Sequence, residues 1–186
     1  LMAVFAGAHG IANGLDAVLD AAAELQRRDR SEIRIVLIGD GKLKSRLQRR
    51  AADEGLTNVL FHEPVSKTRL AGLLAATDVG LQILDNVRAF YDGTSPNKFF
   101  DYLSAGLPVL INYPGWLAEL VLEHRCGYAI PPANPAAFAD ALEHAATHRE
   151  ALPGMRERSE ALARSRFDRQ VLADAWVEWV EGSVPR

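Results

Sequence analysis

Short apolar runs alternate with longer helical stretches along most of the chain, and this alternation limits the fold more than any other feature. The run IRIVLIG, at residues 33–39, is a near-continuous row of branched apolar residues, as expected for a strand covered on both faces. Repeated strand–helix units of this kind predict a parallel sheet with helices on both faces, a three-layer Rossmann-like α/β fold. The expected strands lie at 1–7, 33–39, 58–64, 78–84, 107–112 and 126–132.

The helices expected between these strands have apolar residues at helical spacing. After residue 149 the pattern is helical throughout. A length of 186 residues favours one domain, so we expect a single domain over 1–186 that ends in helices at about 151–182. Because the first strand pattern begins at Leu1 without a preceding segment, we also expect the chain to be a piece of a larger protein.

The composition is that of an ordinary globular protein, with 48% hydrophobic and 24% charged residues. A formal net charge of −3 argues against non-specific nucleic-acid binding, so no nucleic-acid partner is expected. The single cysteine, Cys126, excludes an internal disulfide framework and fits a reducing compartment, which favours a cytoplasmic location. No run approaches the ~18–20 apolar residues of a membrane span. Neither a Ser–His–Asp order nor a metal-ligand motif is present, and we expect no metal and no cofactor.

Loops that follow the predicted strands are the candidate binding sites, because ligands bind at the carboxyl ends of strands in a doubly wound sheet. The first loop, GAHGIANG, is either a tight turn or a glycine-rich approach to a phosphate. His9 in this loop could donate to an anion or cap the turn. In the second loop, Asp40 is expected as a turn or helix-cap residue. The loops concerned are 7–14, 39–42, 62–66, 85–98 and 112–115.

The loop at 85–98 leads into the segment SPNKFFDYLSAG, which reads as one helix with a start and a stop signal. Ser95 is expected to cap this helix and Pro96 to open it. Gly106 would end it in the left-handed conformation. The apolar stripe that the helix would bury consists of Phe99, Phe100 and Leu103.

Lys98 and Asp101 lie three residues apart on one face of this helix, and two interpretations stay open. The first is a core helix with a local ion pair between the two side chains. The second is an anion site, in which Lys98 joins the free N–H groups of the helix start.

The order of these segments resembles the carboxyl-terminal, donor-binding domain of family 4 retaining glycosyltransferases of the GT-B fold. The resemblance rests on LIGDGKLKSRLQRRAADEGLTNVLFHEPV, LAGLLAATDVGLQIL, SPNKFFDYLSAGLPVLIN, GWLAELV and CGYAIPPANPAAFADAL, which cover nearly the whole chain. The motif S-P-x-K-x-F-[DE]-Y-L is most similar to that of sugar transferases of bacterial lipopolysaccharide and capsule assembly.

The resemblance implies two Rossmann-like domains with an active site between them, of which this chain is the second and the amino-terminal acceptor domain is absent. Thr94, Ser95 and Lys98 would cradle the donor diphosphate and Asp101 would accept from the ribose hydroxyls. Lys98 and Asp101 are therefore the expected catalytic residues. The expected donor-binding residues are Gly7, His9, Gly10, Gly39, Gly41, Pro64, Val65, Thr94, Ser95, Asn97, Asn112, Gly115 and Glu119.

The assignments outside the segment SPNKFFDYLSAG come from matching loops, and the last of them keeps an alternative. Pro64 and Val65 match the loop that flanks the base in relatives. Asn112 and Gly115 would line the sugar pocket. Glu119 is either a residue near the donor or a charge on the face of a helix.

Two positions in the first glycine loop depart from the resemblance. Ala8 and Asn13 stand where relatives carry an arginine and a lysine for the donor phosphates. Since a desolvated diphosphate needs at least one charged partner, we infer that Lys98 takes over its neutralisation.

The pair of acids that relatives separate by seven residues is also incomplete. Gly93 stands at the first position, and Asp101, at the second, is one methylene shorter than a glutamate. No residue can be assigned the role of the missing acid, and Asp92 is a candidate only because it is adjacent.

The function that the resemblance implies is transfer of a hexosyl or N-acetylhexosaminyl group, with retention, from a nucleotide-diphosphate sugar. UDP is the expected nucleotide and a glycan or lipid-linked molecule the expected acceptor, in cell-surface polysaccharide synthesis. The isolated chain is expected to be inactive. The full-length protein would work in the cytoplasm, at the inner face of the cell membrane. The alternatives are half of a GT-B nucleotide-sugar epimerase and a non-catalytic nucleotide-binding module.

The last predicted helix carries Trp176, Trp179 and Val180 on one side, with Leu172. For Trp176 we favour core packing. The resemblance implies instead that this helix packs toward the amino-terminal domain, which would leave its apolar surface exposed in this chain.

Overall fold

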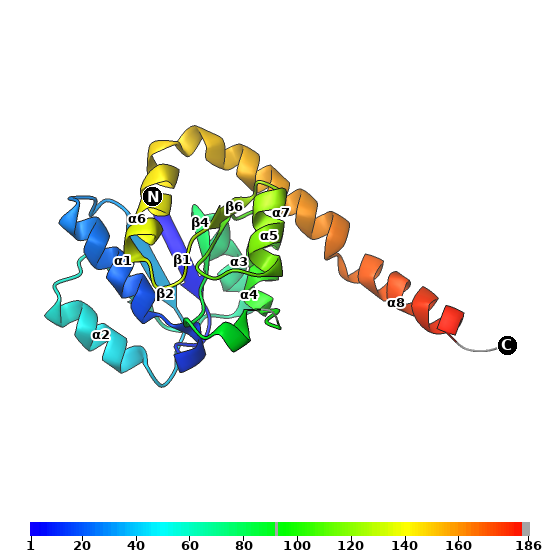
Figure 1. The fold of residues 1–186 in the computed structure, drawn as a ribbon, viewed down its shortest axis with the longest axis horizontal. Helices are drawn as coiled ribbons and strands as arrows, with labels where there is room; N and C mark the ends of the chain where they lie inside the picture. The colour runs from blue at the N-terminus through cyan, green and yellow to red at the C-terminus, as the bar shows by residue number, and fades with distance from the viewer. Residues whose placement is uncertain (92, 184–186) are drawn as a thin grey trace.

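Six strands form one parallel sheet, in the order β3-β2-β1-β4-β5-β6, in the computed structural model (Figure 1). The model describes residues 1–91 and 93–183. From β1 the chain steps outward to β3, then returns to place β4 on the other side of β1, which makes the carboxyl ends of β1 and β4 the topological switch point. The strands are β1 (Met2–Ala6), β2 (Arg34–Ile38), β3 (Val59–His62), β4 (Val79–Gln82), β5 (Val109–Ile111) and β6 (Gly127–Ala129).

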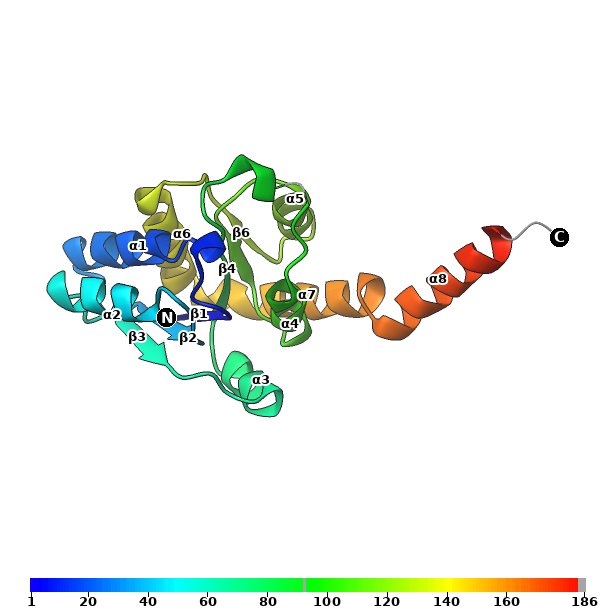
Figure 2. The same ribbon diagram turned by 90° about the horizontal axis from the view of Figure 1, so that it is seen from below.

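Helices cover both faces of this sheet (Figures 1 and 2), so the predicted three-layer Rossmann-like fold is confirmed. Because successive strand residues point to opposite faces, Phe5 packs into one core and Val4 into the other. The first core is closed by α1 (Asp16–Arg27), α2 (Lys44–Asp53) and α6 (Pro135–Thr147). The second is closed by α3 (Lys67–Ala75), α4 (Asn97–Ser104), α5 (Trp116–Glu123) and α7 (Leu152–Arg166).

Within the described residues, three short 3₁₀ helices and one terminal helix complete the elements. The 3₁₀ helices are Ile11–Asn13, Arg88–Phe90 and Arg149–Ala151, and the terminal helix is α8 (Arg169–Ser183). None of the helices in the described part of the chain combines the length and the apolarity needed to cross a membrane.

The start of α4 differs from the prediction. The helix begins at Asn97, and Pro96 is its cap residue, with φ −78°, ψ 132° and no side-chain cap bond. Ser95 therefore does not cap it, because the extended conformation of Pro96 places the serine one residue too far from the first turn. The predicted end is confirmed, since Gly106 has φ +65°.

The buried stripe of α4 is also wider than expected. Phe99 and Leu103 are buried as predicted, whereas Phe100 is half-buried against Phe167. Tyr102 is fully buried and was not predicted. Its ring packs directly on Gly80 of β4, where an added Cβ would lie 2.6 Å from Tyr102 Cγ.

The hydroxyl of Tyr102 lies at the switch point. It accepts a 2.9 Å hydrogen bond from the Ala6 N–H and donates to the carbonyl of Leu81 at 3.4 Å. Paired register between β1 and β4 covers only Ala3 with Val79 and Val4 with Gly80. Tyr102 therefore satisfies backbone groups where the two strands separate, and it fixes α4 against the loop that follows β1.

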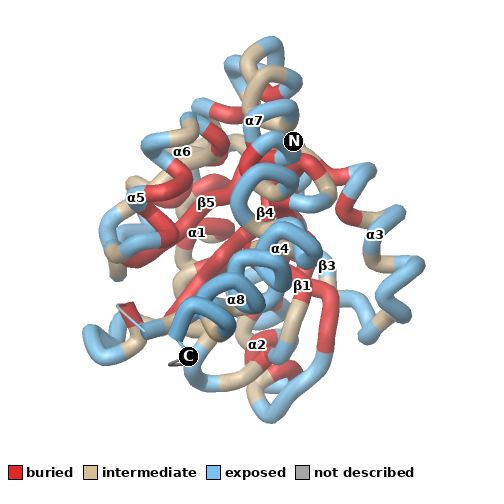
Figure 3. Tube along the Cα trace, turned by 90° about the vertical axis from the view of Figure 1, so that its right-hand side faces the viewer, coloured by how far each residue is buried: buried red, intermediate tan, exposed pale blue. Residues whose placement is uncertain are grey.

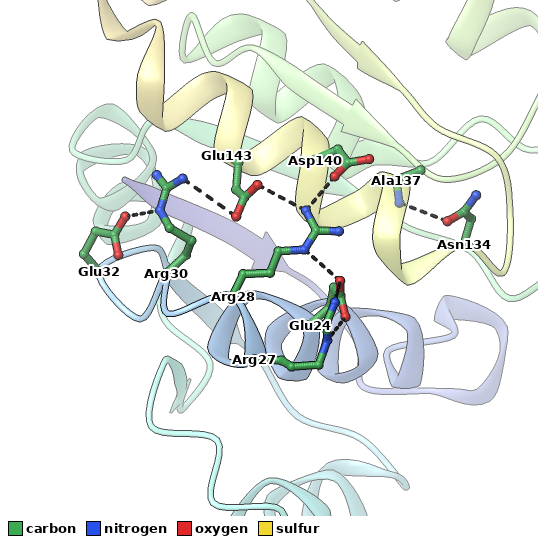
Figure 4. A network of polar contacts seen from close by, with 9 residues as sticks. All are labelled: Glu24, Arg27, Arg28, Arg30, Glu32, Asn134, Ala137, Asp140 and Glu143. Atoms are coloured by element: carbon green, nitrogen blue, oxygen red, sulfur yellow. Dashed lines mark hydrogen bonds and ion pairs between the residues drawn. The ribbon is translucent and has the colours of Figure 1, made fainter.

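A network of charged side chains ties α1 to α6 at the edge of the first core (Figure 4). Arg28, just after α1, bonds Glu24 at 2.7 Å on its own helix. It also bonds Asp140 at 2.6 Å and Glu143 at 3.1 Å, both on α6. One guanidinium thus bonds three carboxylates from two helices, and we call this set of ion pairs the α1–α6 clip.

Helix α8 projects away from the rest of the molecule (Figures 1 and 2). Its residues are exposed almost throughout, as Figure 3 shows, and it has no buried residue. Trp176 is 63% exposed and Trp179 68%, so core packing of Trp176 is wrong. Both tryptophans belong to an apolar surface that this chain does not cover.

Candidate functional site

A cavity of about 510 Å³ opens at the carboxyl ends of β1, β2 and β3, beside the first turns of α3 and α4. Glycines and apolar residues form its floor, and two lysines and two aspartates line its walls. Its size is in the usual range for a small-molecule site. The lining residues are Ala6, Gly7, Ala8, Ile38, Gly39, Asp40, Pro64, Val65, Lys67, Leu70, Asn97, Lys98 and Asp101.

The glycines after β1 and β2 let two loops run in contact at the base of the cavity. The N–H of Gly7 donates to the carbonyl of Ile38 at 3.0 Å, and the N–H of His9 donates to that of Asp40 at 2.8 Å. Gly39 has φ +145°, and a Cβ there would lie 1.9 Å from the Gly7 oxygen. Only glycine fits at this position, because a side chain would collide with the backbone of the first loop, and the predicted approach to a phosphate stays a prediction.

Lys98 extends from the first turn of α4 along the wall of the cavity. Its Nζ donates to Asn13 Oδ1 at 2.6 Å and lies 4.1 Å from the centroid of the Phe5 ring. Burial lowers the pKa of Lys98 to about 8. Among the described residues no carboxylate lies within ion-pair distance of this ammonium. The group is therefore a largely desolvated cation whose charge is not neutralised by the described side chains.

Asp101 lies one turn further along α4 and points to another neighbour. Its Oδ2 accepts from Lys67 Nζ at 2.6 Å, and the two side chains are 35% and 76% exposed. The predicted local ion pair between Lys98 and Asp101 is therefore wrong, because Lys98 reaches the loop after β1 and Asp101 reaches the first residue of α3. The cavity has a cation without a described counter-charge at one end and an ion pair at the other.

His9 and Asp40 stabilise the loops at the base of the cavity. His9 is fully buried against Phe5 and Phe61 and does not line the cavity. Neither of its ring nitrogens has a hydrogen-bond partner among residues 1–91 and 93–183. Burial, with the charge of Lys44, lowers the pKa of His9. Asp40 Oδ1 accepts from the N–H of Gly41 at 2.8 Å, which makes it a turn residue. It does not cap α2, whose cap residue is Leu43.

The structure brings seven of the predicted residues into one cavity and leaves eight outside its lining. Gathered there are Gly7, Gly39, Pro64, Val65, Asn97, Lys98 and Asp101. Outside the lining are His9, Gly10, Gly41, Thr94, Ser95, Asn112, Gly115 and Glu119. Asp92, the candidate for the missing acid, lies outside the described residues.

Several of the eight have structural roles. Gly41 has φ +155° beneath His9, where a Cβ would lie 2.7 Å from the His9 carbonyl oxygen. Thr94 donates from its hydroxyl to the carbonyl of Phe90. Asn112 is buried and joins the ends of β4 and β5 through two 2.9 Å bonds to the backbone of Leu84.

The remaining positions lie at the ends of helices or on their surface. Gly10 precedes the 3₁₀ turn Ile11–Asn13, and Ser95 is exposed before α4. Gly115, with φ +123°, is the cap residue of α5, and Glu119 is exposed in the first turn of that helix.

Lys67, Leu70 and Asn13 are the site residues that sequence reasoning missed. Lys67 is the first residue of α3, directly after Ser66, whose hydroxyl caps that helix by accepting from the Arg69 N–H at 3.3 Å. A lysine directly after a helix cap in a strand-end loop was a usable signal. The sequence marked Asn13 only as the replacement for a lysine, and it gave no signal for the contact with Lys98, which joins residues 85 positions apart.

Comparison with known proteins gives a family and a fold. The family model described as "Glycosyl transferases group 1" matches residues 2–148. No curated protein sequence matches the chain significantly.

Among solved structures, Anabaena Alr3699/HepE in complex with UDP-glucose matches with a TM-score of 0.80 at 17% identity, over 97% of this chain and 48% of that one. WaaG, a glycosyltransferase involved in lipopolysaccharide biosynthesis, matches at 0.72 and 20% identity, over 89% of this chain and 43% of that one. The carboxyl-terminal domain of LpcC from Francisella tularensis matches with a TM-score of 0.72 at 15% identity, over 90% of this chain and 86% of that one. This chain thus spans less than half the length of HepE and WaaG, and the resemblance to GT-B glycosyltransferases is confirmed at the level of family and fold.

Proposed function

The chain belongs to the group 1 glycosyl transferase family, and we propose that it is the donor-binding domain of an enzyme that transfers a sugar from a UDP-sugar. The observation that carries this proposal is the Lys98 ammonium, which is largely buried in the strand-end cavity and has no carboxylate partner among the described residues. A cation in this state is stabilised by an anionic ligand, because the ligand restores the charge partner that burial has removed.

Each part of a nucleoside diphosphate has a matching wall in the cavity. The diphosphate would lie at the Lys98 ammonium and the backbone amides of Asn97 and Lys98, since the next amide, that of Phe99, already donates to the Pro96 carbonyl at 3.0 Å. The ribose hydroxyls would donate to Asp101 once its bond to Lys67 is exchanged. Pro64, Val65 and Leu70 form an apolar slot for the base.

In the reaction, these groups would stabilise the leaving diphosphate as the bond to the sugar breaks. Preorganised donors in a desolvated site are the main means by which a protein stabilises developing negative charge. We propose transfer with retention of a hexosyl or N-acetylhexosaminyl group to a glycan or lipid-linked acceptor. HepE in complex with UDP-glucose supports the choice of a UDP-hexose donor, and WaaG, which is involved in lipopolysaccharide biosynthesis, supports the choice of a glycan acceptor. The process would be cell-surface polysaccharide synthesis in the cytoplasm, at the inner face of the membrane.

The rest of the full-length enzyme would lie against α8. The match to HepE covers 97% of this chain, so it extends into α8, and more than half of HepE lies outside the match. The apolar face of α8 is exposed in this chain: it carries the two exposed tryptophans and Leu172, which is 51% exposed. An exposed apolar face of this kind is typical of an interface with another domain. We propose that the other domain is an amino-terminal acceptor domain, and that the isolated chain binds donor weakly and transfers no sugar.

The test is titration of the chain with UDP, GDP and ADP by calorimetry and by NMR, which detects weak binding. Lys98→Ala is compared with Lys42→Ala, which removes the same charge from an exposed position outside the cavity. We expect saturable binding of UDP that Lys98→Ala weakens by about 1.5–3 kcal/mol, the value of a charged hydrogen bond, while Lys42→Ala has no effect. Equal binding by both variants, or no binding of any nucleotide, contradicts the proposal.

A further inference from the structure

The side chain of Asn13 joins two parts of the donor cavity. Asn13 is the last residue of the 3₁₀ turn in the loop between β1 and α1. Its Nδ2 donates to the carbonyl of Ala8 at 2.8 Å, and its Oδ1 accepts from Lys98 Nζ at 2.6 Å. A carbonyl can only accept and an ammonium can only donate, so these two partners leave the amide a single orientation.

The neighbours of Lys98 explain why this contact matters. The aliphatic stem crosses Gly7, where an added Cβ would lie 3.3 Å from Lys98 Cε. The ammonium then lies over the face of the Phe5 ring and ends at the Asn13 amide oxygen. Backbone, ring and amide hold the ammonium in place, and none of the three carries a negative charge.

We propose that Asn13 is a positioning residue, whose neutral amide holds the Lys98 ammonium at the cavity wall without neutralising it. This inference rests on the proposed function, in which Lys98 binds the donor diphosphate. A carboxylate at position 13 would pair with the ammonium and compete with the diphosphate. A residue without an acceptor would release the ammonium and lose the fixed geometry.

The position of Asn13 also accounts for one departure of the glycine loop, the missing lysine at position 13. A lysine at position 13 would place a second cation against the ammonium of Lys98, since the side chain of residue 13 reaches Nζ within hydrogen-bond distance. An amide at position 13 therefore fits a site in which α4 supplies the cation. The loop between β1 and α1 supplies an uncharged acceptor for that cation.

The experiment compares Asn13→Asp and Asn13→Ala with the wild-type chain. The control is Gln48→Glu, which makes the same amide-to-carboxylate change at an exposed position of α2. The first readout is the pKa of Lys98, followed by NMR of the labelled lysine side chain without any nucleotide. The second is affinity for UDP, and thermal melting checks that each variant is folded.

We expect Asn13→Asp to raise the pKa of Lys98 by about one unit or more, as an adjacent opposite charge does. It should also weaken UDP binding by at least about tenfold, with the ammonium still present. Asn13→Ala should weaken UDP binding less, and Gln48→Glu should change neither readout.

The outcomes separate this inference from the proposed function. An unchanged pKa of Lys98 in Asn13→Asp, with normal UDP binding, would overturn the role of Asn13 alone. A raised pKa with no UDP binding by any variant would support Asn13 as the residue that holds Lys98, and would refute the proposed function.

Discussion

Replacing Lys98 by methionine should make the ligand-free protein more stable at neutral pH, although it removes the cation of the site. Methionine keeps an unbranched apolar stem against Gly7 and Phe5 and removes the charge. Burial lowers the pKa of Lys98 from 10.5 to about 8. At about 1.36 kcal/mol per pKa unit, holding the ammonium in the cavity costs at most about 3–4 kcal/mol. The variant also leaves Asn13 Oδ1 without its donor, which costs about 1 kcal/mol, so a net gain of about 1–2 kcal/mol is expected.

The pH dependence of this gain follows from the direction of the shift. Below pH 8 both folded and unfolded chains carry the proton, and the cost is fully present. Between pH 8 and 10.5 the folded chain loses the proton while the unfolded chain keeps it, so wild-type stability rises relative to the variant. By about pH 9.5 the wild type should have recovered about 2 kcal/mol.

The assay is urea unfolding of wild type and Lys98→Met at about pH 7 and about pH 9.5. Lys42→Met, at an exposed position, is the control and should show no pH-dependent difference. A variant less stable than wild type at neutral pH, or a stability difference equal at the two pH values, would refute the reasoning. The same variant should bind UDP more weakly, by about 1.5–3 kcal/mol, so that ligand binding and stability change in opposite directions.

Further substitutions test the loops and the outer layer. Gly39→Ala should abolish the cavity and lower the free energy of unfolding by more than about 2 kcal/mol, because the added Cβ meets backbone atoms. Gly72→Ala should instead raise the urea midpoint, since Gly72 lies on α3 with open space around it. Arg28→Gln should cost about 1 kcal/mol of unfolding free energy by opening the α1–α6 clip, whereas Arg27→Gln, which bonds only within α1, should leave it unchanged. Lys67→Ala should tighten UDP binding by up to about fivefold, since it frees the carboxylate on α4 from an exposed ion pair; weaker binding would show that Lys67 contacts the donor.

The layers of this fold could be predicted from the sequence because burial repeats with a period. A run such as IRIVLIG is apolar on both faces only where helices cover both, and Ile35 and Val36 indeed point into different cores. Turn chemistry is similarly local: Gly106 ends α4 and Ser66 caps α3 as their residue types require. The exact start of α4 was missed, because proline is compatible with both the cap and the first helical position.

The chemistry of the site is less readable, since a long side chain selects its partner in space. The spacing along the chain places Lys98 and Asp101 on one helix face. It does not show that the loop after β1 brings Asn13 to Lys98, or that the start of α3 brings Lys67 to Asp101. Apolar periodicity likewise cannot distinguish a core from an interface, which is why Trp176 was expected inside and lies outside.

These two kinds of failure have a common physical origin. Strands and buried helix faces are specified by many residues, each of which contributes a little to the same answer. The net charge of a site depends instead on single contacts between segments that are distant in the sequence. Asn13 Oδ1 binds the Lys98 ammonium without adding a negative charge, whereas a carboxylate oxygen in its place would form an ion pair with it. In the function proposed for this cavity, binding therefore depends on a difference between amide and carboxylate that hardly affects the fold, and substitutions at position 13 should change UDP binding while leaving the sheet intact.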